Sequence, residues 1–245
     1  MSEIIKTDAV VISKMDYSNT SKIAVLFTHE FGKISVLVKG ARSAQAKTGR
    51  TVDVLNYIQV ILNKKETREL QYVNQVDLLD GYSKIKDDLV KLKYTVTGLE
   101  LINTLIPEAE QHSRLFRGLV KILSQINNTT SHPAIPMLRF ILFFLKEIGF
   151  ELQFDNCFYC GKEFSDAESV SFNFEKGTIC NDCGKDHLVS FTFTKELFNF
   201  FLCLRQKESN IQVNEREIEI AYNFIEKYLK FHVPEFKGIK SIHLY

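Results

Sequence analysis

The chain has 245 residues, with 31 Lys and Arg against 30 Asp and Glu, so its formal charge is +1 at pH 7. This balance excludes a globally basic nucleic-acid binder, and such a role would need a local patch. The hydrophobic fraction of 45% is that of a folded chain. No secretory signal pattern is visible and the longest apolar stretch, at 141–145, is too short for a bilayer. We therefore expect a cytoplasmic protein with reduced cysteines and no membrane partner.

The first third of the chain has the pattern of β-structure. Short apolar runs with alternating periodicity, separated by turn residues, predict strands, and both faces of the fourth are largely apolar. The expected strands cover residues 9–14, 22–28, 33–38, 54–62 and 70–78. Strands in this number without an intervening helical period predict a small barrel or sandwich.

From about Lys84 the apolar residues recur at spacings of three and four, which predicts helices. The expected helices cover residues 84–106, 113–126, 134–148, 194–204 and 215–231. Ser113 and Thr194 are the expected N-caps of the second and fourth, and Gly149 ends the third, which is apolar nearly all round.

These patterns predict an α+β protein of two parts. Residues 1–80 form a five-stranded β domain, and residues 81–245 form a helical domain with an insert at about 151–192.

The insert contains two Cys-x-x-Cys pairs, Cys157 with Cys160 and Cys180 with Cys183, and a glycine follows each pair. Two residues between thiolates let both sulfurs reach one ion, and four thiolates complete a tetrahedral shell. The spacing predicts one structural Zn²⁺ in a zinc-ribbon-like insert, because a full shell leaves no position for a catalytic water. The alternatives are unpaired buried cysteines or a redox pair. His187 is a possible substitute ligand, and Cys203 is expected in the core.

A basic segment follows the third predicted strand. Residues 31–52 contain no Asp or Glu, and residues 39–50 lack any large apolar side chain, so we expect a solvated loop that does not fill the core. Its cations, with Lys22 from the neighbouring strand, form either a phosphate-binding surface or a loop that is basic by chance. The candidate DNA-binding residues are Lys22, Lys33, Lys39, Arg42, Lys47 and Arg50.

No catalytic pattern is present in the sequence. It contains no phosphate-binding glycine loop, no His-Glu-x-x-His and no Gly-x-Ser-x-Gly, and its histidines have no partnered spacing. We therefore expect no catalytic residues and no enzymatic activity.

Two runs carry a family resemblance. Tyr17-Ser-Asn-Thr-Ser-Lys-Ile-Ala-Val-Leu-Phe-Thr28 is followed by His-Glu-Phe-Gly-Lys-Ile-Ser-Val-Leu-Val-Lys-Gly-Ala-Arg42, and this resembles the N-terminal signature of the bacterial recombination mediator family RecO. The segment Lys146-Glu-Ile-Gly-Phe150, the four-cysteine insert and the final stretch to Ser241 also match its layout, so the resemblance covers essentially the whole chain.

The resemblance implies an N-terminal OB-fold-like barrel and a DNA repair function. Members of the family bind single- and double-stranded DNA, anneal complementary strands and, with RecR, help to load RecA onto strands coated by single-stranded-DNA-binding protein (SSB). They also bind the acidic C-terminal tail of SSB. Where many members have more cations after Arg42, this chain has residues 43–46, Ser-Ala-Gln-Ala, so we expect either a lower DNA affinity or an interface that depends more on Lys47 and Arg50.

An acidic tail ending in an apolar residue needs a cation beside an apolar groove. Arg139 and Lys146 on the Phe-rich third helix are the candidate partner-binding residues, and a plain surface position is the alternative for both. The other function that the sequence allows is a zinc-ribbon adaptor whose barrel binds protein. A zinc-dependent nuclease or deaminase conflicts with the full metal shell.

Overall fold

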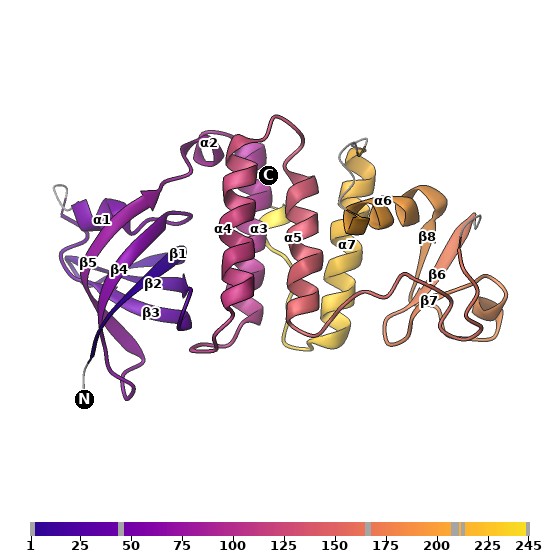
Figure 1. Cartoon of the computed structure of the whole chain (residues 1–245), viewed down its shortest axis with the longest axis horizontal. Helices are drawn as coiled ribbons and strands as arrows, with labels where there is room; N and C mark the ends of the chain where they lie inside the picture. The colour runs from indigo at the N-terminus through magenta and orange to yellow at the C-terminus, as the bar shows by residue number, and fades with distance from the viewer. Residues whose placement is uncertain (1–2, 44–46, 165–167, 207–210, 212–213, 244–245) are drawn as a thin grey trace. The chain divides into compact units, whose positions relative to one another are not determined.

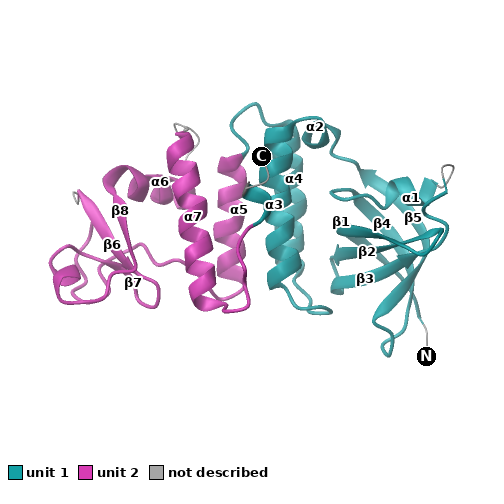
Figure 2. Cartoon of the chain, turned by 180° about the vertical axis from the view of Figure 1, so that it is seen from behind, with its two compact units in different colours: residues 1–133, 240–245 teal, residues 134–239 magenta. Residues whose placement is uncertain are grey.

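The computed structural model describes the whole chain except residues 1–2, 44–46, 165–167, 207–210, 212–213 and 244–245. The chain forms two compact units, residues 1–133 with 240–245, and residues 134–239 (Figure 2). The boundary between the units falls inside the predicted helical domain. Within the described residues, no helix is both long and apolar enough to cross a membrane.

A five-stranded sheet that closes on itself forms the N-terminal part of the first unit (Figure 1). Its strands are β1 (Glu3–Tyr17), β2 (Ser21–Thr28), β3 (Gly32–Val38), β4 (Tyr57–Lys64) and β5 (Leu70–Asp80). The order around the sheet is β1-β2-β3-β5-β4, and all neighbours are antiparallel except β3 and β5. This is an OB-like arrangement, and it confirms the predicted five-stranded β part.

Alternation along the strands fills the interior of this sheet. Ile58, Val60 and Leu62 on β4 share one face and have no exposed surface, as the period of two requires. β1 is much longer than predicted, because it pairs with β2 over its second half and with β4 over its first half.

The basic segment is not simply a loop, which corrects the sequence-based expectation. It includes a short helix, α1 (Lys47–Thr51), and Ala41 belongs to the hydrophobic core. A Cβ on Gly49 would lie 1.8 Å from the carbonyl oxygen of Ala41. Only glycine therefore lets α1 approach the backbone at Ala41 so closely. Residues 44–46, part of the predicted departure from the family pattern, lie outside the described residues.

Three helices complete the first unit: α2 (Ser83–Lys86), α3 (Leu89–Leu105) and α4 (Ser113–Asn128). The predicted single helix over 84–106 is broken because the Asp88 carboxylate accepts hydrogen bonds from the backbone N–H groups of Val90 and Lys91 and caps α3. The N-cap of α4 is His112 rather than Ser113, whose hydroxyl donates to the carbonyl of His29 at 3.2 Å. A one-turn 3₁₀ helix, Ser241–His243, ends the described chain.

The second unit combines three helices with a small sheet. Its elements are α5 (Ala134–Glu147), β6 (Ser169–Asn173), β7 (Gly177–Ile179), β8 (Phe191–Thr194), α6 (Lys195–Gln206) and α7 (Glu215–His232). The sheet order is β7-β6-β8. The Thr194 hydroxyl accepts from the N–H of Leu197 at 3.3 Å, which confirms the predicted cap of α6.

Phenylalanine makes the core of the second unit. Phe193 packs against Phe224 of α7 with ring centroids 4.8 Å apart, and Phe154, Phe172 and Phe201 surround the pair. All five rings are fully buried. This cluster contains five of the chain's 20 phenylalanines and packs the sheet against α6 and α7.

Candidate metal and nucleic-acid-binding sites

The four predicted cysteines come together in the second unit. The Sγ atoms of Cys157, Cys160, Cys180 and Cys183 all lie within 4.8 Å of one another. The first pair lies in a turn that precedes β6, whereas Cys180 directly follows β7 and Cys183 begins a 3₁₀ helix. Pairing of β6 with β7 therefore contributes to bringing two distant sequence segments together.

The geometry of this cluster fits one metal ion. A tetrahedral Zn²⁺ with Zn–S bonds of about 2.3 Å places its sulfurs about 3.8 Å apart. The Sγ atoms of Cys160 and Cys180 are 3.7 Å apart. Four soft thiolate ligands suit zinc and leave no open coordination position.

Backbone N–H groups are directed at one of the sulfurs. Burial raises the pKa of Cys157, but N–H groups of Cys180, Cys160 and Tyr159 outweigh it and lower that pKa to about 6. Gly161 has φ +73, so the first turn requires a glycine. Gly184 has no positive φ; a Cβ there would instead lie 3.3 Å from Ser171 Oγ.

Neither alternative residue joins the cluster. The His187 ring stacks on Tyr159, with centroids 3.6 Å apart, and is not among the clustered ligands. Cys203, on α6, also lies outside the cluster, and it is only partly buried rather than in the core as predicted.

Several candidate DNA-binding residues of the first unit meet at a shallow pocket, which we call the α1 pocket. It has a volume of about 300 Å³ and is lined by Asp16, Lys22, Ala41, Arg42, Ser43, Gly49 and Arg50. Lys39 and Lys47 are exposed on the same segment, and Lys39 is not in the lining. Three of the six predicted cations are therefore brought to one place by β2 and α1.

Arg42 has a counter-charge, although residues 31–52 themselves contain no acid. Its Nε lies 3.4 Å from an Asp16 carboxylate oxygen, and its Nη1 donates to the carbonyl of Ser18 at 2.6 Å. Asp16 lies opposite Lys22 in the β1–β2 pairing, which is how an acid distant in sequence reaches the basic segment. Arg50 is exposed and keeps its charge toward solvent.

Lys33 does not belong to this surface. Its side chain is 9% exposed and its Nζ donates to the Asn103 carbonyl at the C-terminal end of α3, at 2.6 Å. Burial lowers its pKa, while Glu108 acts in the opposite direction. Lys33 is therefore not available to a ligand, because its ammonium caps the end of a helix.

Sequence reasoning missed an aromatic partner of the cations. Tyr72 on β5 is 36% exposed, and the Lys39 ammonium and the Arg68 guanidinium lie 5.0 and 4.3 Å from its ring centroid. These contacts are short enough for cation–π attraction. The sequence could have suggested that Tyr72 lies on the exposed side of β5. A single tyrosine in a strand, however, does not indicate which cations contact its ring.

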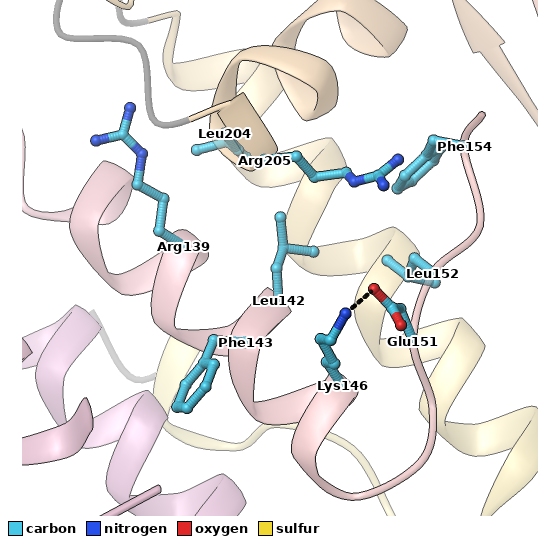
Figure 3. A pocket seen from close by; sticks show the side chains of 9 residues that line it. All are labelled: Arg139, Leu142, Phe143, Lys146, Glu151, Leu152, Phe154, Leu204 and Arg205. Atoms are coloured by element: carbon cyan, nitrogen blue, oxygen red, sulfur yellow. Dashed lines mark hydrogen bonds and ion pairs between the residues drawn. The ribbon is translucent and has the colours of Figure 1, made fainter. Parts of the chain in front are cut away.

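The second unit contains an apolar pocket beside α5, which we call the α5 pocket. It has a volume of about 380 Å³ and is lined by Arg139, Leu142, Phe143, Lys146, Glu151, Leu152, Phe154, Leu204 and Arg205 (Figure 3). The structure thus brings Arg139 and Lys146 to one cavity, with Leu142 between them. Helix α5 is consequently not buried on all sides, although its apolar composition had suggested that it would be.

Two cations of the α5 pocket, Lys146 and Arg205, pair with acidic residues. Lys146 pairs with Glu151 at 2.8 Å, and Arg205 pairs with Asp155 at 3.3 Å. Arg205, on α6, was not predicted from sequence, because it reaches the pocket only through the packing of α6 beside α5.

The fold and these sites define a class of protein: an OB-like barrel with a cation-lined pocket, joined to helices and a four-cysteine cluster. Family models described as "Recombination protein O N terminal" and "Recombination protein O C terminal" match residues 1–82 and 86–241. The chain belongs to this family, RecO, whose members are DNA repair mediators.

Curated relatives agree with this assignment. The chain is 28% identical to the DNA repair protein RecO of Thermoanaerobacter sp. (strain X514), over 96% of this chain and 95% of that one. It is 24% identical to the protein of that name in Pelodictyon phaeoclathratiforme, over 98% and 97%. With the RecO of Geobacter sulfurreducens it shares 31% identity over 74% of this chain and 73% of that one.

Proposed function

We propose that this protein is a non-enzymatic recombination mediator of the cytoplasm that binds single- and double-stranded DNA and anneals complementary strands. With RecR, it would help to load RecA onto SSB-coated single strands. The observation that supports the DNA-binding part most directly is the α1 pocket, where Lys22, Arg42 and Arg50 converge on the barrel. Membership of the RecO family supports the rest.

The α1 pocket suits a phosphate backbone more than a base edge. Its three cations can neutralise the negative charge of phosphates, and the cavity of about 300 Å³ is shallow and polar. Tyr72 with Lys39 and Arg68 adds an aromatic surface on β5 on which an unpaired base can stack. Such binding reduces repulsion between two strands while their pairing edges stay free, which is what annealing requires.

Asp16 limits the strength of this interface. It offsets part of the charge of Arg42 and must give way when a phosphate approaches that guanidinium. Among the described residues of the segment, Lys39, Lys47 and Arg50 are exposed and pair with no acid, so they carry most of the attraction in this proposal.

The direct test is the variant Lys39→Ala/Arg42→Ala/Lys47→Ala/Arg50→Ala. Affinity for a single-stranded oligonucleotide should fall at least tenfold, to a similar extent for different sequences, because phosphate contacts carry no sequence information. A matched control, Lys195→Ala/Lys227→Ala/Lys230→Ala/Lys237→Ala, removes the same charge from the second unit. Unchanged affinity in the first variant, or an equal loss in the control, would reject the α1 pocket as the DNA interface.

In this proposal the cysteine cluster holds one structural Zn²⁺. The four ligands would fix the turn before β6 to the end of β7, and the ion would supply folding energy rather than chemistry.

The α5 pocket is the proposed site for the acidic C-terminal tail of SSB. Leu142, Phe143 and Leu152 offer an apolar lining for the last side chain, and Arg139 offers a partner for the terminal carboxylate. Arg139→Ala should weaken binding of a synthetic acidic peptide with a free C-terminus at least fivefold, with little effect on the same peptide after C-terminal amidation. Equal losses for both peptides would show that Arg139 does not meet the carboxylate.

A zinc-ribbon adaptor whose barrel binds protein is the second candidate. Annealing by the purified protein without nucleotide supports the mediator, and partner binding without annealing supports the adaptor.

A further inference from the structure

Helix α4 of the first unit carries basic residues and no acidic residue at all. Arg114, Arg117 and Lys121 are spaced by three and four, so they lie on one side of the helix, and all three are exposed. Within the described part of the chain, Arg117 and Lys121 form no hydrogen bond and no ion pair. Lys14 on β1 is a contrasting case, because its ammonium pairs with the Asp53 carboxylate.

These two cations line a second pocket of the first unit, which we call the α4 pocket. It has a volume of about 380 Å³, and its other lining residues are Asp8, His29, Tyr57, Phe116 and Val120. The ring of Phe116 lies 5.5 Å from that of His29 and 6.3 Å from that of Tyr57. Side chains from β1, the end of β2 and β4 therefore meet α4 around an aromatic cluster.

The charges in the α4 pocket are separated by element. The cations come from α4, whereas the one lining carboxylate, Asp8, comes from β1. Asp8 accepts from the Tyr57 hydroxyl at 3.0 Å and from the Gln59 amide at 3.1 Å, which holds it on the barrel side. A carboxylate repels phosphate but accepts N–H groups of bases, so a nucleotide fits with its phosphate toward α4 and its base toward the rings and Asp8.

This pocket is far from the α1 pocket. Asp8 and Asp16 lie on the same strand, β1, and belong to the linings of the α4 and α1 pockets respectively. Their separation along the strand is about 26 Å at 3.3 Å per residue. A single nucleotide cannot occupy both, and the two pockets present independent groups of cations.

We propose that the α4 pocket is a second binding site for unpaired nucleic acid, which holds one strand while the α1 pocket holds the other. This inference rests on the proposed annealing function and extends it, because a protein that brings two complementary strands together needs a site for each. The exposed cations on α4 bind the backbone of the second strand, and the half-buried rings of His29 and Tyr57, which pack on the buried ring of Phe116, contact its bases.

The test compares Arg117→Gln/Lys121→Gln with Arg42→Gln/Arg50→Gln in the α1 pocket, and with the control Lys195→Gln/Lys237→Gln. All three remove two charges at exposed positions. Binding stoichiometry is measured with a three-nucleotide oligo-dC, which is too short to reach from one pocket to the other. Annealing is measured with two complementary strands. The full-length protein should bind two oligonucleotides, each pocket variant should bind one, and annealing should slow at least tenfold in both pocket variants while the control stays within twofold.

The outcomes separate this inference from the proposed function. A single oligonucleotide on the unmodified protein, or undiminished stoichiometry and annealing in Arg117→Gln/Lys121→Gln, would overturn the second site and leave the α1 pocket intact. If the Arg42→Gln/Arg50→Gln variant alone is unaffected, the proposed use of the α1 pocket fails instead. Loss of acidic-peptide binding without any loss of annealing in the α4 variant would assign that pocket to a protein partner and reject the inference.

Discussion

The basic residues of the barrel differ in how exposed they are and in whether an acid lies beside them. Lys33 and Arg50 belong to the same basic stretch of sequence, yet one is buried against the end of α3 and the other faces solvent. Arg42 is intermediate, because Asp16 offsets part of its charge. The sign of each side chain's charge can be read from the sequence, but the availability of that charge to a ligand depends on the residue's neighbours in space.

Gly49 is the residue on which the position of α1 depends. In Gly49→Ala the new methyl group would meet the Ala41 carbonyl at 1.8 Å, so α1 must move away from the chain beneath it. We expect a loss of about 1–3 kcal/mol in the free energy of unfolding, measured in urea, together with weaker DNA binding. Gly81→Ala is the control, since its nearest contacts are at 3.8 Å, and an equal loss there would contradict the explanation.

Asp53 predicts a pH dependence of stability. Burial raises its pKa, but the hydrogen bond from Lys14 at 2.5 Å, the charges of Lys14 and Lys86 and the N–H of Val54 outweigh it and lower that pKa. A carboxyl with a lowered folded-state pKa stabilises the fold above its unfolded value, near 3.8, and loses this contribution as pH falls through the folded pKa. The pair is partly exposed, so Asp53→Asn should cost less than about 1 kcal/mol at pH 7.

The measurement is the difference in unfolding free energy between the two proteins from pH 7 to about pH 3. The difference should shrink toward zero at the acid end. A difference that stays constant with pH would mean that the Asp53 charge does not stabilise the fold.

At the scale of elements, the short β6–β7 hairpin has few residues of its own to stabilise it, and the cysteine cluster lies at its end. β7 covers only Gly177–Ile179, too few residues to form a stable sheet alone, and it directly precedes Cys180. An ion held by both Cys-x-x-Cys pairs would anchor this hairpin, and the Phe-rich cluster beside it supplies the remaining packing.

Cys160→Ala and Cys203→Ala separate the metal site from the rest of the second unit. Protein purified without chelator should contain one zinc ion per chain, and Cys160→Ala should lose most of it, because three thiolates leave the shell open. The same variant should become sensitive to protease within residues 157–190. Cys203→Ala, outside the cluster, should keep both the zinc and the protection. Equal metal content in the two variants would reject the four-cysteine site.

At the scale of the whole molecule, the near-zero net charge means that the proposed DNA affinity must come from a local surface. With Lys33 excluded, five predicted cations remain: Lys22, Lys39, Arg42, Lys47 and Arg50. If each meets one phosphate of a single strand, the logarithm of the binding constant should fall against the logarithm of salt concentration with a slope of about −3.5. A slope near zero would remove the electrostatic mechanism, and the four-alanine variant should have a clearly shallower slope than the unmodified protein.

The sequence could predict features that depend on local chemistry. Alternation along β4 placed Ile58, Val60 and Leu62 together, the Thr194 hydroxyl marked the start of α6, and the spacing of the cysteine pairs indicated a shared ion. The break between α2 and α3 was less visible, because Asp88 continues a helical pattern and acts as a cap only once α3 begins after it.

By itself the sequence determined the five-stranded β part, most of the longer helices, the four cysteines that cluster and the family, since each follows from periodicity, spacing or motif within short segments. Only the tertiary structure decided that Lys33 is buried, that Asp16 meets Arg42, that Tyr72 meets Lys39 and Arg68, and that Arg205 reaches the α5 pocket. The reason is physical: these contacts join residues far apart in the chain, and their free energy depends on distance and burial in space, which no local pattern encodes.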